Sequence, residues 1–374
     1  MLSLALLAFP IALIAAIVLR RLLLRRAVPY APDAPQRFHM GETPRVGGIG
    51  ILLGWALALA ALPLLQRLHM AGNLQWEELN LPQWLLMLAP AFAGAVLEDM
   101  THRLRVVLRL LLTLCSAALA VVLLGVTVPR LGFAWADALW RMHPLPALAL
   151  TLLAVTGLPH AFNIIDGYNG LAGSVALVVN VALAHVAIQV GDRELAAIAI
   201  TLAAATAGFL VWNWPLGLVF AGDAGAYLWG LVTACLSLML VQRHAIVSPW
   251  FPLLLLMYPV WETMFSIYRK LRRGDSPGMA DALHLHQLIY RRLIRSVLSA
   301  GEARAMLSRN NRTTPYLLGF EVLTVGPALL FWRYSAVLVV FCALFAGSYV
   351  MAYLLLVHFK AQRAQRAVLQ STRF

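Results

Sequence analysis

The chain has 374 residues, of which 61% are hydrophobic and only 12% are charged, and its formal net charge is +13. A soluble globular domain is nearer half apolar and about a quarter charged, so this composition excludes an ordinary soluble protein and indicates a polytopic membrane protein. Membrane topology explains most of the positive charge, with anionic membrane lipid or a diphosphate substrate as further partners, and nucleic acid is not needed to explain it.

Eleven apolar stretches approach the length of a membrane-spanning helix, which is about 20 residues. Their length and their lack of alternation exclude barrel strands. We therefore expect an all-α polytopic membrane protein in which residues 1–374 form a single integral-membrane domain. In chain order, the predicted spans are roughly 2–19, 47–66, 83–98, 106–126, 146–163, 171–190, 195–212, 225–241, 250–267, 314–332 and 335–357.

Basic residues follow the first apolar stretch instead of preceding it, beginning with Arg20 and Arg21. This order differs from that of a secretory signal peptide and predicts a retained helix whose basic end is cytoplasmic. With the N-terminus outside and the C-terminus in the cytoplasm, 23 of the 29 Lys and Arg residues fall in inner segments. The positive-inside rule favours this threading.

The unusual polar sequence lies in the inner segments, where acids and histidines follow or precede the apolar stretches. Because these groups emerge at one membrane face, we expect them to hold a cation and a charged substrate there. In the last segment, apolar residues from Leu288 to Leu298 recur at helical spacing among arginines, which predicts an amphipathic helix at the headgroup interface. The five segments are 20–46, 98–105, 163–170, 213–224 and a basic arm, 268–313.

Two adjacent carboxylates, Glu98 and Asp99, end the third predicted span, and Arg105 and Arg109 follow them. Carboxylates at this depth are costly unless they pair with a metal ion or another cation, and a surface salt-bridge cluster with the arginines is equally compatible with the pattern. Arg45 follows a proline and precedes two glycines, so it presents a cation on a rigid turn near the start of the second span.

Asn163, Asp166 and Asn169 repeat at every third residue, so they share one face if the chain there is helical. An Asn- and Gly-rich turn is the alternative, but a bare turn does not require three polar groups in register. Asp223 lies between glycines where a span begins, and it is either a helix N-cap or a metal ligand. Oxygen ligands with few thiols favour Mg²⁺, usually held by one or two carboxylates plus substrate phosphates.

His284 and His286 lie two residues apart within the basic arm. Such a pair can donate hydrogen bonds to phosphate, whereas the usual helical zinc pair is four residues apart. The alternative is that both are ordinary interface histidines.

Together, in this order, these segments resemble the polyprenyl-phosphate N-acetylhexosamine-1-phosphate transferase family. The resemblance implies a bundle of eleven spans in the bacterial inner membrane, with the active site facing the cytoplasm. It also implies transfer of a sugar 1-phosphate from a UDP-sugar to undecaprenyl phosphate, with release of UMP and with Mg²⁺ as cofactor or Mn²⁺ as its substitute. The matching segments are 39–48 (HMGETPRVGG), 98–99 (ED), 163–173 (NIIDGYNGLAG), 222–225 (GDAG) and 284–286 (HLH).

The resemblance assigns a role to several of these residues. Asp223 matches the metal ligand, Asp99 the second acid of a paired motif, and Asp166 the acid of the third segment. The two histidines match a motif that contacts the phosphates of the donor. We therefore expect catalytic roles for Glu98, Asp99, Asp166, His284 and His286, and substrate binding by Arg45, Arg105, Arg109, Asn163 and Asn169.

Three positions depart from the pattern that the family usually shows. Glu98 and Asn169 each stand where an Asp is common, and Gln287 stands where a further His is common. The shorter histidine run favours an amino-sugar donor, and the product would initiate an envelope polysaccharide such as O-antigen.

Direct attack of the lipid phosphate and a two-step route through an aspartyl phosphate are both compatible with the sequence. The alternative function is a transporter or flippase of lipid-linked or anionic cargo, but transporters place ionisable groups near mid-membrane and often show inverted repeats. A non-catalytic scaffold would have no reason to gather acids around glycines. A homodimer is compatible with the sequence, which leaves the oligomeric state open.

Overall fold

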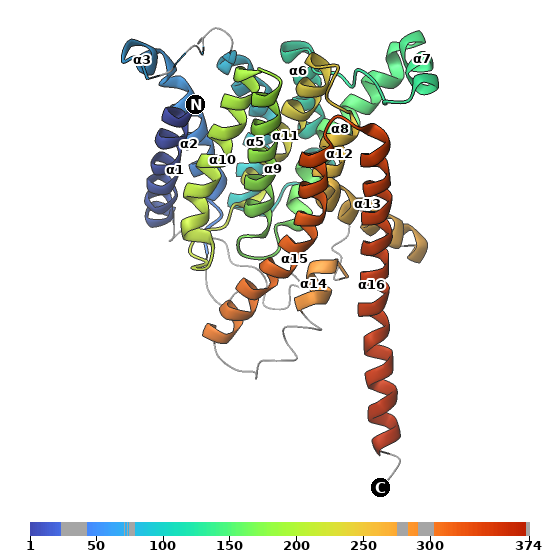
Figure 1. Ribbon diagram of the computed structural model, residues 1–374. Coiled ribbons are helices and arrows are strands. Elements are labelled where there is room, and N and C mark those ends of the chain that lie inside the picture. Colours follow the sequence, from blue (N-terminus) through green and yellow to red (C-terminus); the bar gives the residue numbers. More distant parts are fainter. Residues whose placement is uncertain are drawn as a thin grey trace.

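The computed structural model describes residues 1–23, 43–70, 72, 74, 79–274, 283–290 and 303–371, and every regular element in these ranges is a helix (Figure 1). The predicted all-α class is confirmed. Most of segment 20–46, including positions 39–42 of the first matching motif, lies outside the described residues. The same holds for residues 291–302 of the basic arm, where most of the expected amphipathic helix falls.

Ten helices in the described ranges are long and apolar enough to cross a membrane. In chain order they are α1 (Leu2–Leu23), α2 continued by α3 (Gly47–Ala60 and Leu62–Arg67), α5 (Leu81–Thr101), α6 (Val106–Leu124), α8 (Pro144–Ile165), α9 (Leu171–Gln189), α10 (Arg193–Asn213), α11 (Gly222–Arg243), α15 (Ala303–Phe331) and α16 (Ser335–Ser371). Shorter helices lie between them: α7 (Ala134–Met142), α12 (Trp250–Leu255), α13 (Met257–Arg273) and α14 (Leu285–Ile289).

The predicted continuous span at 250–267 is wrong, because the chain there forms two helices, α12 and α13, that meet at Leu256. Pro259 explains the break. A proline lacks the N–H that a helix needs, and its ring clashes with the carbonyl four residues earlier, which here belongs to Leu255, the last residue of α12. Neither helix reaches the length of a span, so the described residues hold ten candidate spans instead of eleven.

Helix α11 forms the centre of the bundle, since nearly all of its residues are buried by the rest of the protein. Small residues allow its close packing: a Cβ atom on Gly230 would collide with the backbone of Pro159 in α8. Hydrogen bonds also hold it to its neighbours, because the Trp229 indole donates to the Thr206 hydroxyl of α10 at 2.8 Å. Small residues and interhelical hydrogen bonds are what drive helix association in a membrane, where the hydrophobic effect between helices is weak.

Contacts between loops define two ends of the bundle. At one end, Arg130 donates to the carbonyls of Val241 and Val247 at 2.9 and 2.6 Å. The chain begins at this same end, where the Ser3 hydroxyl donates to the Met70 carbonyl at 2.8 Å (Figure 1). The predicted site residues lie at the other end, beyond which α16 extends (Figure 1). The grouping of the acids and histidines at one end, as expected from the threading, is therefore confirmed.

Candidate active site

Asp99 lies near the C-terminal end of α5 and holds the first turn of α11. Its two carboxylate oxygens accept hydrogen bonds from the backbone N–H groups of Asp223 and Ala224, at 2.9 and 3.0 Å. Only a glycine fits at position 222, because φ there is +71° and a Cβ atom would collide with the Asp99 carboxylate. An anion at a helix N-terminus satisfies free N–H groups and complements the helix dipole. Asp99 thus acts as a cap supplied by a different helix.

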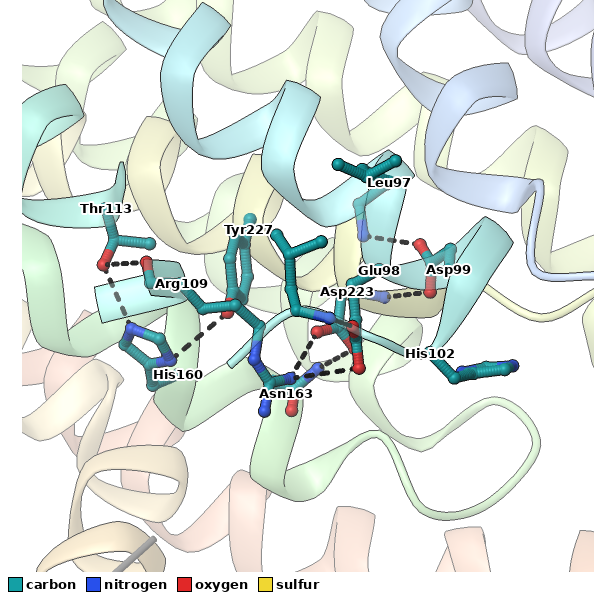
Figure 2. Close-up of polar contacts among 12 residues, drawn as sticks. Leu97, Glu98, Asp99, His102, Arg109, Thr113, His160, Asn163, Asp223 and Tyr227 are labelled. Atoms are coloured by element: carbon teal, nitrogen blue, oxygen red, sulfur yellow. Dashed lines mark hydrogen bonds and ion pairs between the residues drawn. The ribbon is translucent and has the colours of Figure 1, made fainter. Parts of the chain in front are cut away.

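Because Asp99 occupies the backbone N–H groups, the Asp223 carboxylate is directed toward α6 and α8. One of its oxygens accepts a hydrogen bond from the Arg109 guanidinium at 2.9 Å, and the other accepts one from the Asn163 side-chain amide at 2.7 Å (Figure 2). The Asp223 side chain is 10% exposed. Each oxygen therefore has one protein donor, and a carboxylate oxygen has a second lone pair with which to bind a cation.

Glu98 and Arg45 lie next to this acid pair. The Glu98 carboxylate accepts a hydrogen bond from the Leu104 N–H at 2.8 Å, which closes the turn between α5 and α6, and it lies 3.9 Å from the Arg109 guanidinium. The Arg45 guanidinium lies 3.9 Å from the Asp99 carboxylate. Both are therefore at the site, as predicted. Arg105 differs, since its side chain is exposed at the start of α6 and makes no polar contact with the acids in the described residues.

The segment after α8 separates Asn163 from Asn169, which the sequence predicted to lie on one helical face. Helix α8 ends at Ile165, and the chain then turns through Gly167 and Gly170. Because the helix ends before position 169, the spacing of three residues does not place Asn169 on the same face as Asn163. The prediction of a shared face is therefore wrong for Asn169. Its side-chain amide donates to Asn311 at 2.9 Å, at the start of the span in α15, and the residue is buried away from Asp223.

Asp166 directly follows α8, close enough to Arg45 and Asp223 for both charges to act on its carboxyl group. Although its side chain is partly exposed, its dense surroundings raise the pKa of this carboxyl to about 7. Desolvation is the main cause, the negative charge of Asp223 adds to it, and the positive charge of Arg45 opposes it. Near neutral pH, Asp166 can therefore gain or lose a proton.

His284 and His286 form a stacked pair, with ring centroids 5.2 Å apart and an interplanar angle of 8°. The pair lies against the segment after α8, because a Cβ atom on Gly167 would be 3.1 Å from the His286 ring, and the Tyr168 ring packs edge-on against that ring at 5.5 Å. Both predicted histidines are therefore brought next to Asp166 through its neighbours in sequence.

Two ionisable residues at the site, one fully buried and one partly exposed, were missed from the sequence. Glu262, on α13, contacts His284 at 2.9 Å. His160, on α8, lies 3.1 Å from the Thr113 hydroxyl and 3.4 Å from the Tyr227 hydroxyl (Figure 2). Each interrupts a predicted apolar span, and an ionisable residue within a span is the signal that could have revealed both.

The hydrogen bonds around His160 assign its protons. The Thr113 hydroxyl lies within 3.1 Å of two backbone carbonyls of its own helix, so it donates its hydrogen to one of them and accepts from the Nε2–H group of His160. The Nδ1 atom then accepts from the Tyr227 hydroxyl. A neutral histidine thus links α6, α8 and α11 behind the site.

The described residues contain no group of three or more His, Cys, Asp or Glu side chains arranged to hold a metal ion. A protein cage of the kind that binds zinc or calcium is therefore not present among them. Asp223 with substrate phosphate oxygens remains a suitable set for Mg²⁺, which keeps several waters and usually takes one or two carboxylates from the protein.

The model of the glycosyl transferase family 4 matches residues 81–241, which run from α5 to the last turn of α11 and include Glu98 and Asp99, Asp166 and Asp223. The undecaprenyl-phosphate alpha-N-acetylglucosaminyl 1-phosphate transferase of Yersinia pestis is 30% identical over 288 residues, which cover 73% of this chain and 72% of that protein. The chain belongs to glycosyl transferase family 4.

Two further proteins are similar to this chain at lower identity. The probable undecaprenyl-phosphate N-acetylglucosaminyl 1-phosphate transferase of Bacillus subtilis is 25% identical over 75% of this chain and 75% of its own length. The undecaprenyl-phosphate alpha-N-acetylglucosaminyl 1-phosphate transferase of Escherichia coli K12 is 28% identical over 68% of this chain and 66% of its own length. The matched family region ends before Glu262 and the two histidines.

Proposed function

We propose that this protein transfers the 1-phosphate of an N-acetylated amino sugar, such as N-acetylglucosamine, from a UDP-sugar to undecaprenyl phosphate. The products are a lipid-linked diphospho-sugar and UMP. Similarity to relatives named for this activity supports the reaction class. The observation that carries the proposal is the placement of Asp223, whose carboxylate is held by side chains from two other helices at one end of the apolar bundle.

The cations around Asp223 suit a substrate with several negative charges. Arg109 keeps one buried N–H group, its Nε, without a hydrogen-bond partner among the described residues, and Arg45 lies at the edge of the same cluster. Guanidinium groups match phosphate geometry through paired N–H donors. Arg109 and Arg45 are therefore assigned to the donor diphosphate and the lipid phosphate, with His284 and His286 as further donors.

Asp223 is assigned to a Mg²⁺ ion shared with the donor diphosphate, because its oxygens keep lone pairs on the side away from Arg109 and Asn163. When bound, Mg²⁺ would neutralise charge that develops on the diphosphate. Asp99 positions Asp223 by holding its backbone N–H, and Asn163 fixes the rotation of the carboxylate.

In the transfer, an oxygen of the lipid phosphate forms a bond to the phosphorus that carries the sugar, and the bond from that phosphorus to the oxygen bridging to UMP breaks. Phosphoryl transfer of this kind depends on positioning and charge neutralisation. A phosphate monoester has a second pKa near 6, so the attacking group is mostly a dianion at neutral pH and needs little help from a base. A two-step route through Asp99 would first have to release that carboxylate from α11, because both its oxygens are bonded there.

The cellular setting follows from the same proposal. The site end of the bundle faces the cytoplasm of a bacterial inner membrane, where UDP-sugars are found, and the C-terminal part of α16 extends from that face (Figure 1). The N-terminus is then outside. The lipid-linked product would initiate an envelope polysaccharide such as O-antigen.

The test uses the purified full-length protein in lipid nanodiscs. It is incubated with undecaprenyl phosphate and, one at a time, with UDP-N-acetylglucosamine, UDP-N-acetylgalactosamine and UDP-glucose, with Mg²⁺ or with EDTA, and both UMP and the lipid product are measured. We expect UMP only when lipid phosphate, an amino-sugar donor and Mg²⁺ are all present.

Two results would contradict parts of this proposal. Absence of UMP with every donor removes the transferase activity, and movement of lipid-linked cargo across vesicles without UMP release would favour a flippase. Full activity in EDTA removes the assignment of Asp223 to Mg²⁺ while leaving the reaction class intact.

A further inference from the structure

A fully buried acid, Glu262, contacts the first histidine of the stacked pair, His284. Glu262, on α13, has no exposed surface, and its carboxylate has three donors. One oxygen lies 2.9 Å from Nδ1 of His284 and 3.4 Å from the backbone N–H of Leu285, and the other accepts a hydrogen bond from the Tyr349 hydroxyl of α16 at 2.6 Å. The acid therefore joins α13, the start of α14 and α16.

This arrangement determines which nitrogen of His284 carries the shared proton. A buried carboxylate is stable only when it is paired and hydrogen-bonded, and the Tyr349 hydroxyl and Leu285 N–H are neutral donors. His284 is its ionisable partner, so Nδ1 bears a hydrogen that points to Glu262. The other ring nitrogen, Nε2, is on the far side of the ring from Glu262, where it can meet a substrate. An acid that orients a histidine in this way sets both its tautomer and its ring direction.

The same contact determines where the second histidine lies. The His286 ring stacks on the His284 ring and touches Gly167 and Tyr168, the residues that follow Asp166. The ring pair is therefore held between Glu262 on one side and the segment after α8 on the other. Loss of the Glu262 carboxylate would release His284 and, through stacking, the position of His286.

We infer that Glu262 is a positioning residue for the donor phosphates: it holds His284 with Nδ1 protonated, so that the stacked histidines face the UDP-sugar. This inference rests on the proposed transferase function. It assigns to α13, a helix outside the matched family region, a role in binding one substrate and not the other.

The test compares steady-state kinetics of the full-length protein and of Glu262→Gln, varying the UDP-sugar and undecaprenyl phosphate separately. Gln keeps the shape of the side chain but not its charge. We expect kcat/KM for the UDP-sugar to fall by at least about 10-fold, while the KM for undecaprenyl phosphate stays within about two-fold. Glu262→Asp, which keeps the charge on a shorter arm, should recover part of the loss.

A double variant separates positioning from a general packing defect. If Glu262 acts through His284, then Glu262→Gln in a His284→Asn background should add no further loss, whereas independent effects would multiply. Tyr349→Phe removes one donor to the Glu262 carboxylate but leaves the contact with His284, so it should raise the donor KM by only a few-fold.

Three outcomes would overturn the inference: multiplicative losses in the double variant, equal changes in the two substrate KM values, or wild-type kinetics in Glu262→Gln. If Glu262→Gln does not fold, unchanged donor KM in both Glu262→Asp and Tyr349→Phe would also overturn it. Failure of the proposed function is distinguishable, because the unmodified protein would then release no UMP.

Discussion

Two Gly-Asp pairs begin helices at opposite ends of the bundle. Gly191-Asp192 precedes α10, and Gly222-Asp223 starts α11. Both glycines have a positive φ, +82° and +71°, and both aspartates contact an arginine. From local sequence the two are nearly equivalent, so the difference between them shows what turns a helix start into a site.

Asp192 caps its own helix. One of its oxygens accepts a hydrogen bond from the Leu195 N–H at 3.0 Å, and the other lies 3.4 Å from Arg243 and 3.0 Å from His244. Its partners lie in the first turn of α10 and at the C-terminal end of α11. This is the usual behaviour of an N-cap residue, and its role is structural.

Asp223 does not cap its own helix, because Asp99 of α5 caps α11 instead. Its carboxylate is free to bond Arg109 and Asn163 from two other helices. Transferring the capping role to a distant residue thus leaves an acid at a helix start, oriented from both sides and able to bind a cation.

The strongest test of this comparison is the pair Asp223→Asn and Asp192→Asn. We expect Asp223→Asn to lower UMP release by at least about 100-fold, since the charge that we propose binds Mg²⁺ is lost while Asn163 and Arg109 remain. Asp192→Asn should keep activity within about two-fold, because Asn is as good an N-cap as Asp. Comparable activity in both variants would show that Asp223 is only another structural acid.

The second test concerns stability and compares Asp99→Asn with the same Asp192→Asn control. Asn has one acceptor oxygen, so one buried N–H of the α11 first turn loses its partner, at a cost of about 1–3 kcal/mol in the free energy of unfolding. The favourable charge at the helix N-terminus is lost as well. Denaturant unfolding in EDTA should show Asp99→Asn as clearly less stable than Asp192→Asn, and equal stability would contradict the capping role.

Substitution of the two glycines sharpens the comparison. Ala at a positive φ costs roughly 1 kcal/mol by itself, and at position 191 there is open space around the added Cβ atom. At position 222 the added Cβ atom would also push against the Asp99 carboxylate. Gly222→Ala should therefore be the more destabilised of the two in thermal unfolding and should also lose activity. Equal melting temperatures would show that the Asp99 contact relaxes without cost.

The smallest expected effect is a pH dependence that arises at the site end, from Asp166. Burial raises the pKa of Asp166 to about 7, so between pH 4 and pH 7 the folded protein holds a proton there that the unfolded chain releases. Stability therefore falls as the pH rises through this window. Asp166→Asn should flatten the slope of melting temperature against pH in EDTA. An unchanged slope would mean that other groups cause it.

The helical class of this protein and the end of the bundle at which its acids lie could be predicted from its sequence, because hydropathy shows which stretches are apolar enough to lie within a membrane. The all-α class followed from the length of the apolar stretches, and the gathering of Glu98, Asp99, Asp166 and Asp223 at one end followed from threading those stretches in alternating directions. The span at 250–267 failed for a local reason, because an apolar average does not reveal that Pro259 breaks the helix.

Only the tertiary structure decided which polar group meets which. Hydropathy cannot show that Asp99 caps α11, that Asn163 joins Asp223 while Asn169 joins α15, or that Glu262 lies under His284. These partners are separated by 22 to 142 residues, so their meeting depends on how whole helices pack. The sequence determined that charged groups would gather at one end of an apolar bundle, and the packing of the helices around α11 determined that Asp99 caps this helix while the Asp223 carboxylate keeps lone pairs for a cation.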